Sequence, residues 1–383
     1  MNKPVKSVVA GIGFIGPVHI ESLRRLLGIE VSAISHSSIT SAEKKARELG
    51  IVNYYANYAD MLEKEKPDVV HICTPNHLHY DMAKLALENG IHVVCEKPLA
   101  TSVKQAEELI VLAEKKQLVH AVNFNIRYYP LVRQMKAIRE KGELGAIYSI
   151  IGTYLQDWLF FATDYNWRLE PEQSGESKAV ADIGSHLLDI IEYISGLHIT
   201  EVFADFSTIH PVRKKSINPI ETYSGKLVKA SETVDVPVVT EDYATVLLRF
   251  NNNTKGVATV SQVAAGRKNR LSLEISGASK TLQWHSEKPN ELWIGNRDAP
   301  NTILLRDPSL VDAAAASIIS YPGGHNEGFP DTSKQLFKEI YAAVRSGTQP
   351  AEPTYPTFKS GLRELILCEK IIESNKKQQW VKI

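Results

Sequence analysis

From Lys6 to Val122 the sequence alternates short apolar runs with amphipathic segments, and this alternation constrains the fold more than any other feature. The apolar runs predict strands at 6–10, 29–34, 52–54, 67–73, 91–95 and 118–122, and helical apolar spacing lies between them. Strands separated by helices form strand–helix–strand units with right-handed crossovers and parallel neighbours. The first part of the chain is therefore predicted to be an α/β domain with a doubly wound parallel sheet.

After residue 124 the pattern changes to strands that follow one another with few helices between them. Strands are expected at 146–156, 200–209, 242–250, 256–264, 271–276 and 281–285, and helices at 132–141, 179–194, 331–344 and 355–374. We predict a first domain over residues 1–123 and an α+β domain over 124–383 with a large, open, mostly antiparallel sheet. The polar segment 211–239 is predicted to be an irregular arm, and the last helices are expected to pack back on the first domain.

Composition and charge exclude several classes of protein. The chain has 383 residues, of which 43% are hydrophobic, and this rules out a mainly disordered protein. Its 44 basic residues balance 44 acidic ones, so we expect no nucleic-acid partner. We expect no membrane span, because no run of about 18 apolar residues occurs. Three widely spaced cysteines predict reduced thiols, no bound metal and a cytoplasmic location.

The segment from Gly11 to Gly16 has the pattern GxGxxG, with Phe14 and Ile15 before the last glycine. It follows the first strand and opens the first helix. In this setting Gly11 permits a tight turn, Gly13 lets the backbone approach a pyrophosphate, and Gly16 allows the helix to pack closely on the strand. N–H groups at the helix N-terminus would bind the phosphates. A glycine-rich packing turn is the alternative, and the surrounding units favour a dinucleotide site.

The end of the second strand bears on the choice between NAD and NADP. An acidic residue usually follows this strand and binds the ribose 2′-hydroxyl. Here the strand ends in Ser35, His36 and Ser37, so the carboxylate that would repel a 2′-phosphate is absent and no arginine replaces it. The sequence therefore predicts NAD or NADP without choosing between them.

Lys97 follows the fifth strand in the segment Cys95–Pro98. The carboxyl ends of parallel strands face the cofactor crevice in this architecture. A lysine at that position can stabilise a developing alkoxide or move a proton. The alternative is a surface loop with a salt bridge.

Asp182 and His186 lie four residues apart in the predicted helix over 179–194 and would share one of its faces. A histidine base with a carboxylate partner suits the oxidation of an alcohol. The imidazole takes the hydroxyl proton as hydride leaves, and the carboxylate orients the ring. The alternative, which spacing alone favours, is a helix-start aspartate beside a histidine packed in the core.

Four motifs occur in a fixed order, namely GxGxxG, residues 74–79 (TPNHLH), Glu96-Lys97-Pro98, and Asp182 with His186. In this respect the whole chain resembles the Gfo/Idh/MocA oxidoreductases. The resemblance implies a Rossmann domain followed by an open-sheet domain that builds homodimers or homotetramers. It also implies that Lys97, Asp182 and His186 surround the nicotinamide and the substrate hydroxyl, and that the Lys97–Pro98 bond is cis.

The resemblance extends to further site residues. Contacts to the cofactor are expected from Thr74, Pro75, Asn76, His79, Glu96, Trp167 and Arg168. Contacts to the substrate are expected from Asn125, Gln156, Asp157 and Trp158. A glycine-rich loop before a helix could also bring His325 or Asn326 to the substrate, and the alternative is a simple connector. The Gln-Asp-Trp segment with the later Trp-Arg pair resembles a subset that includes levoglucosan and other sugar dehydrogenases. Amide and carboxylate groups bind sugar hydroxyls, and an indole stacks on C–H faces.

The sequence thus predicts an NAD(P)-dependent oxidoreductase that acts on a secondary alcohol or ketone of a sugar or polyol. Two alternatives stay open within the same resemblance. One is a nucleotide-binding sensor without turnover, and the other is a redox-neutral glycosidase that regenerates its NAD. The intact residues Lys97, Asp182 and His186 argue against the sensor.

Overall fold

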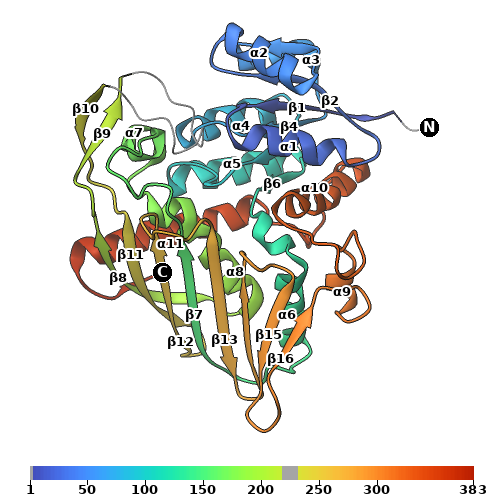
Figure 1. Ribbon diagram of the computed structural model, residues 1–383. Coiled ribbons are helices and arrows are strands. Elements are labelled where there is room, and N and C mark those ends of the chain that lie inside the picture. The colour runs from blue at the N-terminus through green and yellow to red at the C-terminus, as the bar shows by residue number, and fades with distance from the viewer. Residues whose placement is uncertain (1–2, 218–231) are drawn as a thin grey trace.

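Six parallel strands form the first sheet, in the order β3-β2-β1-β4-β5-β6 (Figure 1). The structure is a computed structural model that describes residues 3–217 and 232–383. The strands are β1 (Val5–Ala10), β2 (Ile29–Ser35), β3 (Asn53–Tyr55), β4 (Val69–Ile72), β5 (His92–Cys95) and β6 (His120–Val122). Their order is that of a dinucleotide-binding sheet, which confirms the predicted doubly wound fold.

Five helices connect these strands, and their ends follow from local sequence signals. They are α1 (Ile15–Arg24), α2 (Ile39–Leu49), α3 (Tyr58–Glu65), α4 (His79–Glu88) and α5 (Val103–Lys116). The side chain of Ser38 caps α2, and Gly50 ends that helix with φ 62°. Ser102 caps α5 in the same way. All four residues of β4 are buried, as expected for a strand that is covered on both faces.

Nine strands form the second sheet, in the order β16-β15-β14-β13-β7-β12-β11-β8-β17. They are β7 (Ile147–Leu155), β8 (Ile199–Ser207), β11 (Tyr243–Phe250), β12 (Lys255–Ser261), β13 (Arg270–Gly277), β14 (Thr281–His285), β15 (Glu291–Gly295), β16 (Thr302–Leu305) and β17 (Val381–Lys382). Among these strands β7 and β12 pair in parallel, and the other pairs are antiparallel. The predicted open, mostly antiparallel sheet is therefore confirmed.

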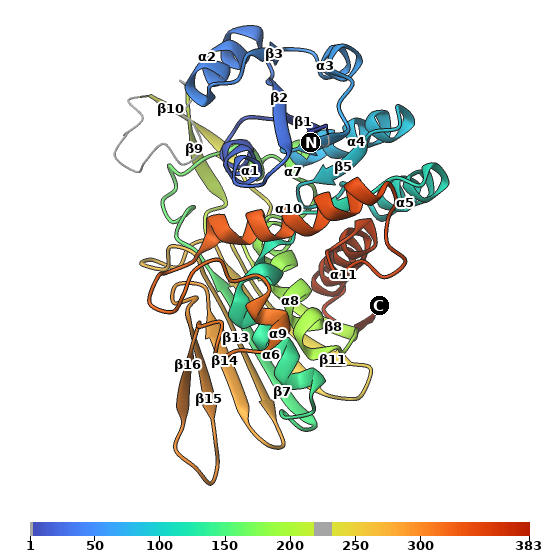
Figure 2. The ribbon, with the colours of Figure 1, turned by 90° about the vertical axis from the view of Figure 1, so that its right-hand side faces the viewer.

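Helices cover one face of this second sheet and leave the other face open (Figure 2). The covering helices are α6 (Pro130–Glu140), α8 (Ser185–Ser195) and α11 (Phe358–Lys377). Helix α10 (Phe329–Ser346) instead packs on the first sheet, where Phe337 and Tyr341 share a buried cluster with Val9 and Ile20. The structure also has two short helices, α7 (Pro171–Ser174) and α9 (Ala313–Ala316). In the described ranges no helix combines the length and apolarity that crossing a membrane requires.

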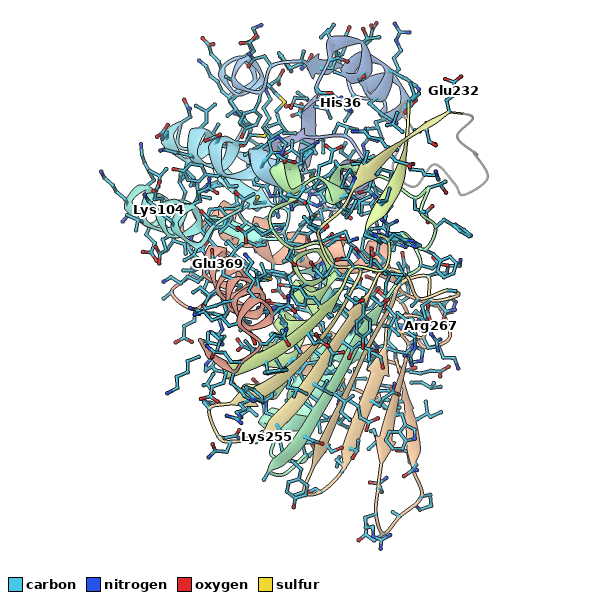
Figure 3. The ribbon with its side chains drawn as sticks, turned by 90° about the vertical axis from the view of Figure 1, so that its left-hand side faces the viewer. His36, Lys104, Glu232, Lys255, Arg267 and Glu369 are labelled. Carbon is cyan, nitrogen blue, oxygen red and sulfur yellow. The ribbon has the colours of Figure 1, made fainter. Side chains whose placement is uncertain are left out.

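The prediction of an irregular arm over 211–239 was wrong at both ends of that segment. Strands β9 (Val212–Ser216) and β10 (Thr233–Pro237) pair there as an antiparallel ribbon, and residues 218–231 lie outside the described residues. Arg213 anchors the ribbon, because its buried guanidinium donates 2.6 Å to Asp242 and also to backbone carbonyls. In Figure 3 the ribbon rises to the height of His36. Strands β15, β16 and β17 were also missed.

Buried histidines make the fold sensitive to acid. His120 accepts a hydrogen bond from the Phe358 N–H at its Nδ1, and burial lowers its pKa to about 4. Burial likewise lowers the pKa values of His71 and His79. The unfolded chain, with histidine pKa values near 6.5, binds more protons in this range. Stability is therefore complete above about pH 6.5 and falls as the pH drops toward 4, by about 3 kcal/mol for His120 alone.

Urea unfolding at pH 7.5, 6 and 5 checks this expectation. The free energy of unfolding should fall steadily across the series, and His120→Gln should remove part of the slope because glutamine can still accept the Phe358 N–H. Equal stability at all three values would contradict the assignment of neutral buried imidazoles.

Candidate active site

The glycine turn between β1 and α1 has the geometry of a dinucleotide cradle. Gly11 has φ +87°, and a Cβ there would lie 2.6 Å from the backbone carbonyl of Cys73. A Cβ on Gly16 would lie 2.3 Å from the oxygen of Gly11. In contrast, no atom lies within 4 Å of a Cβ built on Gly13. The backbone packing therefore requires glycine at positions 11 and 16, whereas at Gly13 there is open space where a side chain would be.

Helix α1 begins without a side-chain cap. Phe14, whose side chain cannot accept a hydrogen bond, occupies the N-cap position, and the first turn after Ile15 carries no acidic residue. The N–H groups of a helix N-terminus attract anions most when no side chain neutralises them. The open space above Gly13 and the uncapped helix fit a pyrophosphate, so the residues present suit a dinucleotide.

The end of β2 lies where the adenosine ribose of such a cofactor would lie. Ser35 is buried, and its carbonyl accepts the N–H of Gly11. The Ser37 N–H donates 2.8 Å to Nδ1 of His36, whose position at the strand end is visible in Figure 3. The strand end itself, Ser35–Ser37, contributes no carboxylate.

Lys97 and Asp182 form the central contact of the site and join the two halves of the molecule. The Lys97 Nζ lies 2.9 Å from Asp182 Oδ1 and 2.6 Å from the Asp182 carbonyl oxygen. Arg168 Nε donates to the same Oδ1 at 3.2 Å, and Gln262 Nε2 donates to Oδ2 at 2.9 Å. The cations of Lys97 and Arg168 outweigh burial and lower the pKa of Asp182 well below its usual range. The carboxylate is thus a fixed anion with both oxygens occupied.

His186 lies beside this ion pair in an apolar setting. It is 9% exposed, and Phe124 packs edge-on against its ring with centroids 5.7 Å apart. Burial, aided by the charge of Lys97, lowers the pKa of His186 to about 3, so the imidazole is neutral at physiological pH. Its Nδ1 is buried and has no hydrogen-bond partner among the described residues.

The comparisons with known proteins agree with this geometry. Residues 5–124 match the model of the oxidoreductase family with an NAD-binding Rossmann fold, and residues 132–283 match the GFO/IDH/MocA C-terminal domain. The chain belongs to the Gfo/Idh/MocA oxidoreductases.

Individual members of the family are similar over nearly the whole chain. Levoglucosan dehydrogenase of Pseudarthrobacter phenanthrenivorans is 29% identical over 360 residues, which cover 91% of this chain and 88% of that protein. Inositol 2-dehydrogenase/D-chiro-inositol 3-dehydrogenase of Lactiplantibacillus plantarum is 25% identical over 327 residues, which cover 81% of this chain and 87% of that protein. A solved levoglucosan dehydrogenase in complex with NADH has a TM-score of 0.88 and 26% identity, and covers 100% of this chain and 99% of that chain. The predicted family resemblance is confirmed.

The hydrogen-bond partners of the Asp182 carboxylate in this Gfo/Idh/MocA protein are Lys97, Arg168 and Gln262. The chain from Val180 to Gly184 forms a π-helical turn, and the regular helix α8 begins only at Ser185. A residue pair four apart shares one face only in a regular α-helix. Asp182 holds Lys97, from 85 residues earlier in the chain, and acts on the imidazole through its charge.

Two residues expected at the cofactor also join elements of the protein. His79 is fully buried, and its ring nitrogens lie 2.7 and 2.8 Å from the carbonyl oxygens of Pro98 and Thr74. Asn76 donates from its amide to the carbonyl of Ser174 at 3.0 Å, and so ties the segment after β4 to α7. The Lys97–Pro98 bond is cis, as the resemblance implies.

Other residues predicted to contact the cofactor have the following neighbours in the protein. Pro75 precedes the short 3-10 helix Asn76–Leu78, and the Arg168 guanidinium lies 4.4 Å from the Trp167 ring centroid. The Glu96 carboxylate turns inward, where the Asn123 amide donates to it.

The residues expected at the substrate fall into two groups. Gln156, Asp157 and Trp158 follow β7 and contact the loop before β13: the Gln156 amide donates to Asn269, and Asp157 pairs with Lys268. Trp158 Nε1 donates to the Lys268 carbonyl at 2.9 Å. This group lies close to the ion pair along the sheet, because the Gln156 N–H donates to the carbonyl of Ser261, the residue before Gln262.

The second group lies elsewhere. Asn125 is buried and donates 2.7 Å to the Thr332 hydroxyl on α10. His325 is exposed, and its loop is held by Arg306, which donates to the carbonyls of Tyr321, Pro322 and His325. Neither side chain contacts Lys97 or Asp182 in the described structure, so the expectation of substrate proximity gains no support.

Sequence reasoning missed Gln262, whose amide fixes the second oxygen of Asp182. Its signal was a polar residue directly after the alternating strand β12. No group of three His, Cys, Asp or Glu side chains able to hold a metal occurs within residues 3–217 and 232–383.

Proposed function

We propose that the protein is an NAD-dependent dehydrogenase that oxidises a secondary alcohol of a sugar or polyol, or reduces the matching ketone. The observation that carries this proposal is the Lys97–Asp182 ion pair beside a neutral His186, whose Nδ1 has no hydrogen-bond partner in the described part of the chain. A cation and a proton acceptor side by side are the two groups that alcohol oxidation requires. Bound NAD would supply a hydride acceptor for the carbon that carries the hydroxyl.

Each of the three residues has a distinct role in this proposal. As an ammonium ion paired with Asp182, Lys97 has N–H donors but no lone pair, so it would stabilise the developing alkoxide. Asp182 accepts hydrogen bonds on both oxygens and would hold Lys97 in place. His186 has a neutral ring nitrogen and would accept the hydroxyl proton.

The relatives support the choice of cofactor and substrate class. Solved neighbours include levoglucosan dehydrogenase in complexes with NADH and levoglucosan, at 26% identity. The lack of a carboxylate after β2 leaves NADP as a second cofactor to test. The amide, carboxylate and indole of Gln156, Asp157 and Trp158 suit the hydroxyls and C–H faces of a carbohydrate. Sugars and cyclic polyols are therefore the first substrates to test.

We also propose a homodimer or homotetramer through the open face of the second sheet. Phe203, Leu247, Val257 and Ile151 pair in one row across β8, β11, β12 and β7. Leu247 is 43% exposed and Ile151 is 49% exposed.

Three buried, free cysteines support a reducing, cytoplasmic setting.

A panel of sugars and polyols, each with NAD and with NADP, tests the proposed function through nicotinamide absorbance. We expect free NADH to accumulate with at least one sugar or cyclic polyol. Hydrolysis of a glycoside without accumulation of NADH would instead identify a redox-neutral glycosidase. Tight NADH binding without turnover of any substrate would identify a sensor.

A further inference from the structure

A chain of buried polar side chains runs from helix α10 to the catalytic loop after β5. The Ser7 hydroxyl lies 2.5 Å from the Tyr341 hydroxyl, which lies 3.0 Å from Nε2 of His71. The two Nδ1 atoms of His71 and His19 are 2.9 Å apart, and His19 Nε2 lies 2.9 Å from Glu96 Oε1. All five residues are more than nine-tenths buried. The chain therefore runs through the interior of the Rossmann domain, away from solvent.

Four separate elements and the catalytic loop contribute to this chain. Ser7 lies on β1, His71 on β4, His19 on α1 and Tyr341 on α10. Phe337, one turn before Tyr341 on α10, packs against the His19 and His71 rings at centroid distances of 4.7 and 4.8 Å. Helix α10 thus supplies both the hydroxyl group and the apolar cover.

The Glu96 carboxylate fixes the direction of every hydrogen bond when both imidazoles are neutral. An ionised carboxylate only accepts hydrogen bonds, so His19 donates to it from Nε2 and accepts at Nδ1. The Asn123 amide nitrogen, 3.1 Å from the same Nε2, then donates to Glu96 and not to the imidazole. His71 must then donate from Nδ1 and accept at Nε2. Tyr341 donates to that nitrogen and accepts from Ser7. All protons therefore point toward Glu96, and hydrogen bonds arranged in series polarise one another.

Glu96 connects this chain to Lys97. Its Oε2 accepts the backbone N–H of Lys97 at 3.3 Å, while its Oε1 accepts from the Asn123 amide and from His19. Rotation of this carboxylate would disturb the backbone that carries Lys97, whose Nζ must reach Asp182. His19 also lies on α1, the helix whose N-terminus fits the pyrophosphate.

We infer that His19, His71 and Tyr341 are positioning residues, which orient Glu96 and thereby set the Lys97 amine for hydride transfer. This inference rests on the proposed function, because it assigns a catalytic purpose to the position of Lys97. Helix α10, from the last sixty residues or so of the chain, then acts on the catalytic loop as well as covering the first sheet.

Removing one buried hydroxyl from the chain, with a matched control, tests the inference. Tyr341→Phe deletes the donor to His71, and Tyr128→Phe deletes an equally buried hydroxyl that donates 2.6 Å to Glu339 on α10. Both variants should lower the melting temperature by a few degrees. Only Tyr341→Phe should lower kcat, by about tenfold, with KM for NAD within about twofold of the parent value.

Rescue by a conservative variant separates positioning from packing. Glutamine can present an amide N–H where His19 presents Nε2–H, whereas alanine cannot. His19→Ala should therefore lower kcat at least as much as Tyr341→Phe, and His19→Gln should restore most of it. If Tyr341→Phe and His19→Ala both keep kcat within twofold of the parent while the melting temperature falls, the chain only docks α10 and the inference is overturned.

Two measurements test the inference without any enzymatic turnover. If no sugar is oxidised, the proposed function fails, but these two measurements still decide whether the chain positions Lys97. Imidazole nitrogen NMR should find the proton of His19 on Nε2 and that of His71 on Nδ1. A His19 protonated only at Nδ1 would overturn the inference, because Glu96 would lose its donor. Crystal structures of His19→Ala and Tyr341→Phe should have Lys97 Nζ displaced from Asp182. An unchanged Lys97–Asp182 pair in both variants would also overturn it.

Discussion

Lys97→Ala is expected to lower kcat for sugar oxidation by at least about a thousandfold while changing the Kd for NAD by no more than about threefold. The Lys97 amine is 2.9 Å from Asp182, and Lys97 is not among the described residues that contact the glycine turn. Its loss removes the cation that would stabilise the alkoxide, but leaves the phosphate-binding backbone intact. Stopped-flow absorbance measures hydride transfer, and NADH fluorescence titration measures affinity.

Two further variants separate the effect of the Lys97 charge from the effects of packing and of general lysine loss. Lys97→Met retains a long side chain and its packing without the charge, so it should lose as much activity as alanine if the charge matters. Lys104→Ala removes an exposed lysine from α5 (Figure 3) and should behave like the parent protein. Unchanged turnover in Lys97→Ala, with a substrate that the parent protein oxidises, would contradict the proposed role.

The fold could be predicted from sequence wherever burial imposes a period on the side chains. Central strands of the first sheet such as β4 are buried on both faces and read as apolar runs. Strands β7, β11 and β12 alternate because one face packs on helices. Strands β15 and β16 escaped prediction because they lie at the edge of the second sheet. There the face pattern is weak: only Leu292 and Gly295 are buried in β15, and no residue is buried in β16.

The residues of the candidate site could be predicted from the sequence, but the contacts between them could not. Lys97, Asp182, His186 and Arg168 were all named, yet the partner of Asp182 was not, because a π-helical turn changes which side chains meet. The Ser7–Tyr341 contact spans 334 residues of sequence, and no local pattern could indicate it. Local spacing therefore identifies which residues carry the chemistry, whereas the tertiary fold decides which of them touch.

Gly13→Ala is expected to fold like the parent protein and to bind NADH at least about tenfold more weakly. A Cβ at this position meets no protein atom within 4 Å, so the melting temperature should change by less than about 2 °C. The methyl group would instead occupy the space in which a pyrophosphate approaches the backbone. Calorimetric titration with NADH and thermal unfolding measure the two effects in the same sample.

Gly11→Ala is the matched control, because it adds a methyl group to the same turn at a position where the protein backbone leaves no space for it. Its Cβ would lie 2.6 Å from the Cys73 carbonyl group, in a backbone with φ +87° that strains any L side chain. Stability should therefore fall by several kcal/mol, so that affinity and folding are lost together. If Gly13→Ala binds NADH as tightly as the parent protein, the glycine segment is only a packing turn. A loss of affinity without a loss of stability is a result that packing alone cannot produce, and it would assign the open space above Gly13 to the cofactor.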